Sequence, residues 1–197
     1  DLGWSRGLGD VYKRQNVMDA ESLFGLLNRY FAAIAAPVLL EQGLLDKFIG
    51  DAVMAEFGVP VHRGDRVEAL AAVRSALAMQ ANLEELNREL EREGLEPLRQ
   101  GIGIHCGEVI AGNLGSSDRL EYTVIGATVN LASRLESLTR QFPDYPILMS
   151  GDVRDQIFDD VVVEDLGEHL VKGWPEPIKV FGLVSLRPSH DLADRIS

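Results

Sequence analysis

The chain has 197 residues, of which 46% are hydrophobic, which is enough for one sizeable domain with a buried core. Its formal net charge is −12 at pH 7, and such an acidic surface repels a phosphate backbone, so we expect no nucleic-acid partner. The only cysteine, Cys106, excludes an intrachain disulfide and favours a cytoplasmic location. The apolar run 31–40 is too short to span a bilayer, so we expect a membrane only through segments absent from this chain.

The first fifteen residues differ from the rest of the chain. They are rich in glycine and show no hydrophobic periodicity, and the run that begins at Asp10 matches the translation of a transposase sequencing adapter. We therefore expect 1–15 to be non-native or disordered, 16–187 to form one domain, and 188–197 to be a tail.

The first predicted element is a helix. Apolar residues at helical spacing begin after Asp19, which is a suitable N-cap, and stop before Gly43. Pro37 within this stretch predicts a kink or an earlier end.

A hairpin and a second helix follow. Two extended runs, 44–49 and 52–57, flank a Gly-Asp pair that suits a two-residue hairpin turn, which places Asp51 at an exposed tip. Asp65 and Glu68 then match a capping box, the pattern expected where a long helix begins.

The rest of the chain mixes both periodicities. Alternating and helical patterns predict strands over 98–106, 109–112 and 122–125 with a polar loop over 114–120, then a helix over 127–140, a strand over 147–149, a short helix over 152–158, and strands over 161–164 and 178–184. This order predicts an α+β fold in which helices cover one face of a largely antiparallel sheet.

Several polar residues in these elements are candidates for nucleotide chemistry. Asp51 can supply hard oxygen ligands to a divalent cation, although aspartate is also common in hairpin turns for structural reasons. Lys47 can donate to a base or to phosphates, or it can be a solvated charge on an edge strand. Asn130 and Arg134 are four residues apart and share one helix face.

Taken together, these segments resemble the class III nucleotidyl cyclases. The likeness rests on the order and spacing of Lys-Phe-Ile-Gly-Asp-Ala-Val-Met-Ala, Gly-Ile-Gly-Ile-His-Cys-Gly-Glu-Val, Tyr-Thr-Val-Ile-Gly and Thr-Val-Asn-Leu-Ala-Ser-Arg-Leu-Glu, which begin at 47, 101, 122 and 128. The resemblance implies a ferredoxin-like core and a head-to-tail homodimer with two active sites in its interface. It also implies attack of the ribose 3′ oxygen on the α-phosphate, assisted by two divalent metals per site, Mg²⁺ or Mn²⁺.

The resemblance assigns a role to each candidate. Asp51 would hold metal, Asn130 the ribose, Arg134 the charge that develops on phosphate, and, on a weaker match, Lys172 the triphosphate. Lys47 and Thr123 would read the base. Lysine only donates, so it fits the N1 acceptor of adenine, and the threonine oxygen can accept from N6. Guanylyl cyclases typically carry glutamate at the lysine position, so we expect ATP rather than GTP as the substrate.

One departure from the family bears on activity. The first metal aspartate should lie on a strand before the first helix, and nothing in 1–18 resembles that strand, so we expect a sheet that lacks its first strand and a chain with impaired activity. Two alternatives stay open, a guanylate cyclase and a non-catalytic, dimerising regulatory domain. A diguanylate cyclase is disfavoured because its Gly-Gly-Asp-Glu-Phe signature is absent. We expect structural roles for His105 and Cys106.

Overall fold

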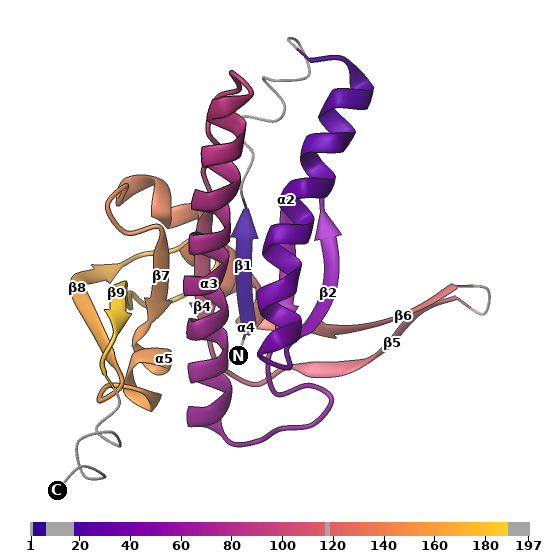
Figure 1. Cartoon of the computed structure of the whole chain (residues 1–197). Helices are drawn as coiled ribbons and strands as arrows, with labels where there is room; N and C mark the ends of the chain where they lie inside the picture. The colour runs from indigo at the N-terminus through magenta and orange to yellow at the C-terminus, as the bar shows by residue number, and fades with distance from the viewer. Residues whose placement is uncertain (1, 7–17, 117–118, 189–197) are drawn as a thin grey trace, which may run out of the picture.

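The structure is a computed structural model that describes residues 2–6, 18–116 and 119–188 (Figure 1). Helices and strands are mixed along the chain, and several strands follow one another directly. In order, the elements are β1 (Leu2–Arg6), α2 (Ala20–Leu40), β2 (Leu44–Ile49), β3 (Ala52–Glu56), α3 (Asp65–Arg92), β4 (Gly101–His105), β5 (Ile110–Ser116), β6 (Arg119–Ile125), α4 (Ala127–Leu138), the 3₁₀ helix η1 (Thr139–Gln141), β7 (Ile147–Ser150), α5 (Gly151–Gln156), β8 (Val161–His169) and β9 (Ile178–Leu186).

Seven strands form one sheet in the order β2-β3-β1-β4-β7-β9-β8. All neighbours in it are antiparallel except β4 and β7. Strands β5 and β6 form a separate ribbon that projects from the body of the domain (Figure 1). The predicted α+β class and the largely antiparallel sheet are therefore confirmed.

Helices lie on both faces of the sheet, which corrects the prediction that they cover one. In β4, Ile102 and Ile104 pack in the core beneath α2 and α3. The alternating residue Gly103 lies against α4, where an added Cβ would clash with the backbone of Ala132 and Glu136. The close approach of α4 therefore depends on glycine in β4. The sequence did not predict this second covered face because glycine has no side chain that would mark a buried position.

Strand β1 corrects the prediction that the sheet lacks its first strand. Leu2–Arg6 pairs with β3 on one side and β4 on the other, in the middle of the sheet. Backbone N–H and C=O groups make these ladders, so a glycine-containing segment without clear alternation can still fill the position. The five residues of β1 include no carboxylate. The suspected adapter residue Asp10 lies outside the described residues, as do 189–197 of the predicted tail.

Helix α2 begins as predicted. The Asp19 carboxylate accepts hydrogen bonds from the backbone N–H of Ser22 at 2.9 Å and from its hydroxyl at 2.8 Å. The helix continues through Pro37 to Leu40, so the prediction of an early end is wrong; only three residues follow the proline in the helix. Pro37 has no N–H to donate to the carbonyl of Ala33 four residues earlier, and this carbonyl accepts from the Asn82 side chain at 2.9 Å instead.

Among the described residues, α2 is the one helix long and apolar enough to cross a membrane by length and composition. This is weak evidence, because a core helix passes the same test. Tyr30, Ile34 and Val38 are completely buried in the main core cluster. We therefore interpret α2 as a core helix, packed beside α3 (Figure 1).

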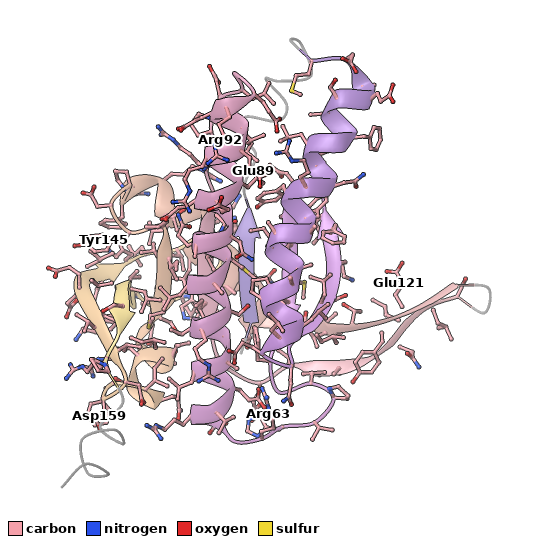
Figure 2. The ribbon with its side chains drawn as sticks, in the orientation of Figure 1. Arg63, Glu89, Arg92, Glu121, Tyr145 and Asp159 are labelled. Atoms are coloured by element: carbon pink, nitrogen blue, oxygen red, sulfur yellow. The ribbon has the colours of Figure 1, made fainter. Side chains whose placement is uncertain are left out.

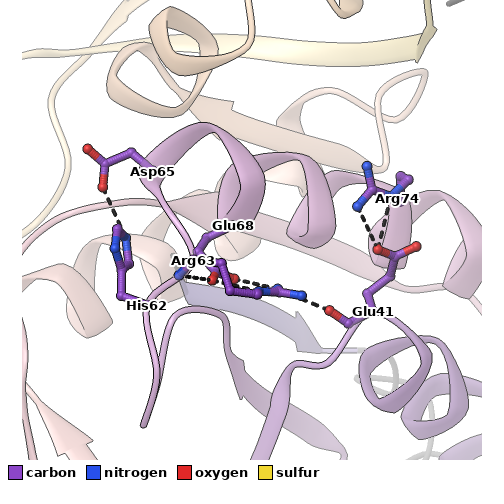
Figure 3. A network of polar contacts seen from close by, with 6 residues as sticks. All are labelled: Glu41, His62, Arg63, Asp65, Glu68 and Arg74. Atoms are coloured by element: carbon purple, nitrogen blue, oxygen red, sulfur yellow. Dashed lines mark hydrogen bonds and ion pairs between the residues drawn. The ribbon is translucent and has the colours of Figure 1, made fainter.

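The start of α3 is stabilised differently from the predicted capping box (Figure 3). Gly64 is the N-cap, and Glu68 accepts from the backbone N–H of Arg63 at 2.9 Å and from its guanidinium at 2.6 and 2.8 Å. These hydrogen bonds lower the pKa of the Glu68 carboxyl. Arg63 also donates to the backbone carbonyl of Glu41, which ties the loop before α3 to the end of α2.

The ribbon of β5 and β6 replaces the predicted polar loop over 114–120. Its pairing continues from Ile110 opposite Ile125 to Ser116 opposite Arg119. Figure 2 shows the side chain of Glu121 on this ribbon, away from the body of the domain. Both faces of its outer part are exposed, so the sequence carries no alternation of buried and exposed residues by which to recognise strands.

Candidate active site

Lys47, Thr123 and Asp46 meet across β2 and β6. The Lys47 ammonium donates to the Thr123 hydroxyl oxygen at 3.0 Å and lies 3.3 Å from one oxygen of the Asp46 carboxylate. The Thr123 hydroxyl donates to the other oxygen of Asp46 at 2.5 Å. The structure thus brings together the two residues predicted to read a base, and it adds an aspartate that the sequence analysis missed.

A β-bulge places these side chains. Leu45 pairs with Ala55, but Lys47 pairs with Met54, so Asp46 is the extra residue on β2. Leu45 packs on the core beneath α2 and α3, whereas Met54 belongs to the cluster on the face of α4. Without the bulge, Leu45 and Lys47 would share a face of the sheet. The bulge therefore turns Lys47 to the face that carries α4.

A second buried acid lies beside this cluster. Glu56 on β3 is 1% exposed and interacts with the side chain of Asp46. Burial, followed by the charge of Asp46, raises the pKa of Glu56 to about 8. At neutral pH the site therefore contains a neutral Glu56 beside the Asp46 carboxylate.

We expect the substitution Glu56→Gln to change how stability depends on pH. Between the ordinary pKa of 4.5 and about 8, folded Glu56 keeps a proton that the unfolded chain has lost. The free energy of unfolding then falls by about 1.4 kcal/mol per pH unit as pH rises through this range. Glutamine is neutral throughout, so the variant should gain stability relative to the parent as pH rises from 5 to 8.

Urea unfolding at several pH values measures this difference. Glu84→Gln, at an exposed position on α3, is the matched control and should give a curve parallel to that of the parent. A curve for Glu56→Gln that also runs parallel to the parent between pH 5 and 8 would contradict the buried, protonated state of Glu56.

Asn130, Arg134 and Lys172 line one cavity of about 200 Å³, together with Leu131, Val171, Gly173 and Trp174. The first two come from exposed positions on α4, and Lys172 comes from the loop after β8. The structure thus brings Lys172, whose sequence match is weak, to the same cavity as the α4 pair. Two cationic side chains and an amide around one cavity suit a ligand with negative charge and hydroxyl groups. Trp174 was missed because no motif includes it.

Asp51 lies at the turn between β2 and β3, as predicted. Gly50 before it has a φ of 64°, a left-handed conformation that glycine adopts without strain. Neither of the two clusters above includes Asp51.

The described residues do not present a complete metal site. No group of three or more His, Cys, Asp or Glu residues among them could hold a cation. Strand β1, where the family resemblance places a second carboxylate, has none in Leu2–Arg6. The donor set that we can name for a divalent cation is therefore the single carboxylate of Asp51, which does not fit a two-metal centre by itself.

His105 and Cys106 have the structural roles expected of them. His105 is buried and shares a hydrogen bond of 2.8 Å with the hydroxyl of Ser150. Burial lowers the pKa of His105 to about 4, so its ring is neutral at physiological pH. Burial also raises the pKa of the Cys106 thiol to about 11, which disfavours the reactive thiolate.

Comparison with known proteins agrees with this geometry. Residues 10–185 match the family described as the adenylate and guanylate cyclase catalytic domain. The chain belongs to this family. The cyclase domain is 33% identical over 180 residues to Adenylate cyclase 1 of Rhizobium meliloti (strain 1021), a match that covers 90% of this chain and 27% of that protein. The chain thus spans about a quarter of the length of such curated relatives.

Solved structures give the same fold for the cyclase domain. The adenylyl cyclase CyaB from P. aeruginosa is similar with a TM-score of 0.86 and 34% identity, over 94% of this chain and 93% of that one. The guanylyl cyclase Cya2 is similar with a TM-score of 0.85 and 31% identity, over 96% and 93%. The predicted cyclase fold is therefore confirmed. Because one neighbour is an adenylyl and the other a guanylyl cyclase, the likeness leaves the choice of base to the residues of this chain.

Proposed function

We propose that this cyclase domain is an adenylate cyclase, which converts ATP to 3′,5′-cyclic AMP and pyrophosphate for signal transduction. The contact between Lys47 and Thr123 carries the proposal. It presents an N–H donor beside a hydroxyl oxygen, the complement of the N1 acceptor and N6 donor of adenine. Guanine offers a donor and an acceptor in the opposite places.

Each remaining residue of the site has a task in this reaction. Asn130 orients the ribose so that its 3′ oxygen can form a bond to the α-phosphorus while the bond to pyrophosphate breaks. Arg134 stabilises the negative charge that builds on the phosphate oxygens, and Lys172 binds the triphosphate. The shared cavity of these three residues supports the assignment, because a ligand in it contacts all of them.

A head-to-tail homodimer accounts for the position of Asp51. The base-reading cluster and the cavity on α4 lie in one protomer, and Asp51 belongs to neither. In the proposed dimer, Asp51 serves the site whose other residues come from the partner. Large apolar side chains are exposed on β2 and on the ribbon, which is expected of a surface covered by a second copy: Phe48, Ile49, Ile110, Leu114, Leu120 and Ile125.

The cyclase family generally uses divalent metals, and we propose Mg²⁺ or Mn²⁺ bound with the help of Asp51. When bound, such a cation would neutralise charge on the nucleotide phosphates. With a single carboxylate named for this purpose, we propose that the chain as it stands has low turnover. The two alternatives are a guanylate cyclase, favoured by the likeness to Cya2, and a non-catalytic dimerising domain, favoured by the incomplete metal site.

Product formation from ATP and GTP distinguishes these functions. The full chain, at concentrations that favour dimers and with Mn²⁺, should form cyclic AMP slowly and cyclic GTP more slowly still. The double substitution Lys47→Glu with Thr123→Cys should reverse this preference, because glutamate accepts from the N1–H of guanine and the thiol can donate to O6. Preferred use of GTP by the parent would favour the guanylate cyclase. Nucleotide and metal binding without product, even after the carboxylate substitution described in the Discussion, would favour the non-catalytic domain.

A further inference from the structure

We propose that Asp46 is a specificity-determining positioning residue, which fixes the direction of the hydrogen bonds that Lys47 and Thr123 offer to the base. This assignment deepens the proposed function and depends on it. Asp46 lies at the bulge of β2 with its side chain 2% exposed, so it reaches the base through its two neighbours and not directly.

A threonine hydroxyl alone does not discriminate between adenine and guanine. It has one O–H to donate and two lone pairs that accept, and it rotates to suit its partner. It can accept from the N6 amino group of adenine or donate to O6 of guanine. A site that reads the base through Thr123 therefore needs a further group to fix its rotation.

The Asp46 carboxylate fixes it. One Asp46 oxygen accepts the Thr123 proton at 2.5 Å, so Thr123 has no hydrogen left to donate to a base. One lone pair of the hydroxyl is occupied by Lys47 at 3.0 Å, and the other is left to accept. In the direction of the base, Thr123 is thus an acceptor only.

The same carboxylate orients the lysine. The Lys47 ammonium has three N–H groups, of which one points to Thr123 and one to the other Asp46 oxygen at 3.3 Å. The third is left to donate. One donor and one acceptor side by side match adenine at both positions and oppose guanine at both.

Burial makes this arrangement rigid. Asp46 is almost completely enclosed, and water cannot replace the carboxylate as the acceptor for Thr123. Glu56, buried beside Asp46, is neutral at pH 7, so the lysine faces a single negative charge. The enclosed Asp46 carboxylate therefore holds Lys47 and Thr123 in one hydrogen-bonding arrangement.

Binding of nucleotides that cannot be cyclised tests the role of Asp46 without turnover. The probes are 3′-deoxy-ATP and 3′-deoxy-GTP with Mn²⁺, titrated calorimetrically into the full chain. The parent should prefer the adenine analogue. Asp46→Asn should reduce this preference roughly tenfold or more. In either orientation of the asparagine amide, its NH₂ group replaces the oxygen that accepts from Thr123 or the one that accepts from Lys47. Asp155→Asn, an exposed aspartate on α5, is the matched control and should leave the preference unchanged.

The pattern of the change separates specificity from structure. A purely structural Asp46 would weaken both analogues equally in Asp46→Asn and leave their ratio unchanged, which would overturn the assignment. In a Thr123→Val background, Asp46→Asn should alter the ratio much less, because the hydroxyl that it orients is gone. An undiminished effect there would also overturn the assignment.

Three further outcomes are decisive. If Asp46→Asn does not fold, judged by circular dichroism, Thr123→Ser and Thr123→Val carry the test: serine should keep the preference for adenine and valine should lose it, and a valine variant that keeps it overturns the assignment. A parent chain that binds neither analogue overturns the proposed function and the role of Asp46 with it. A parent that prefers adenine while Asp46→Asn keeps the ratio overturns the role of Asp46 alone.

Discussion

An aspartate introduced at the end of β1 is expected to raise the turnover of ATP by about 100-fold or more in the presence of Mn²⁺. The substitution is Arg6→Asp, because position 6 pairs with Ala52, the residue after Asp51. Of the residues of β1, position 6 is therefore the one whose backbone pairs nearest to the turn that carries Asp51. A second carboxylate helps to hold cations that contribute several kcal/mol to the transition state, and each 1.4 kcal/mol changes the rate tenfold.

Ser5→Asp is the matched control, since neighbouring residues of a strand lie on opposite faces of the sheet. It should leave turnover unchanged or reduce it. Titration of Mn²⁺ followed by electron paramagnetic resonance gives a readout that does not depend on activity, and Arg6→Asp should bind more tightly than Ser5→Asp. The same substitution at Gly7, the next residue in the chain, is the second variant. If none of the three differs from the parent in metal binding or turnover, a missing carboxylate does not limit this domain.

The second large effect concerns Arg134. In the more active Arg6→Asp background, Arg134→Ala should lower kcat by roughly 100- to 1,000-fold and change KM much less, because its contact with phosphate charge strengthens in the transition state. The kcat of Arg134→Lys should lie between those of the background and of Arg134→Ala. An ammonium keeps the charge but loses the planar, bidentate hydrogen bonding of guanidinium. Steady-state kinetics of cyclic AMP formation measure both constants.

Arg92→Ala is the control for loss of a cation. Arg92 lies in the last turn of α3 and is not among the residues that line the cavity on α4. Its removal should leave kcat within about twofold of the background. An Arg134→Ala variant whose KM rises while kcat is unchanged would place Arg134 in ground-state binding and not in the chemical step.

The local signals in the sequence were strong at the hairpin of β2 and β3 and on α4. A Gly-Asp pair between two apolar runs allows few structures besides a tight turn, and the structure has strands within one residue of the predicted bounds. The spacing of Asn130 and Arg134 fixed their shared face on a helix. Their meeting with Lys172 needed the whole fold, because nothing local predicts which loop faces α4.

Other features depend on tertiary context that composition does not reveal. Strand β1 is stabilised by its pairing with β3 on one side and β4 on the other, and not by a strand preference of its residues. Asp46 is the extra residue of the bulge in β2, and an alternating sequence pattern does not predict such a shift of register. Glu56 lies in an otherwise apolar strand where sequence patterns predict a hydrophobic residue, and only burial identifies it as a neutral acid.

The hairpin of β2 and β3 carries the base-reading lysine on one strand and the carboxylate of Asp51 at its turn. In the proposed head-to-tail pair, one hairpin therefore serves two reaction centres, each with a different residue. A substitution of Lys47 in one copy and of Asp51 in the other therefore disables the same reaction centre and leaves the second centre intact. Two variants that are each inactive as homodimers can thus complement one another in a heterodimer.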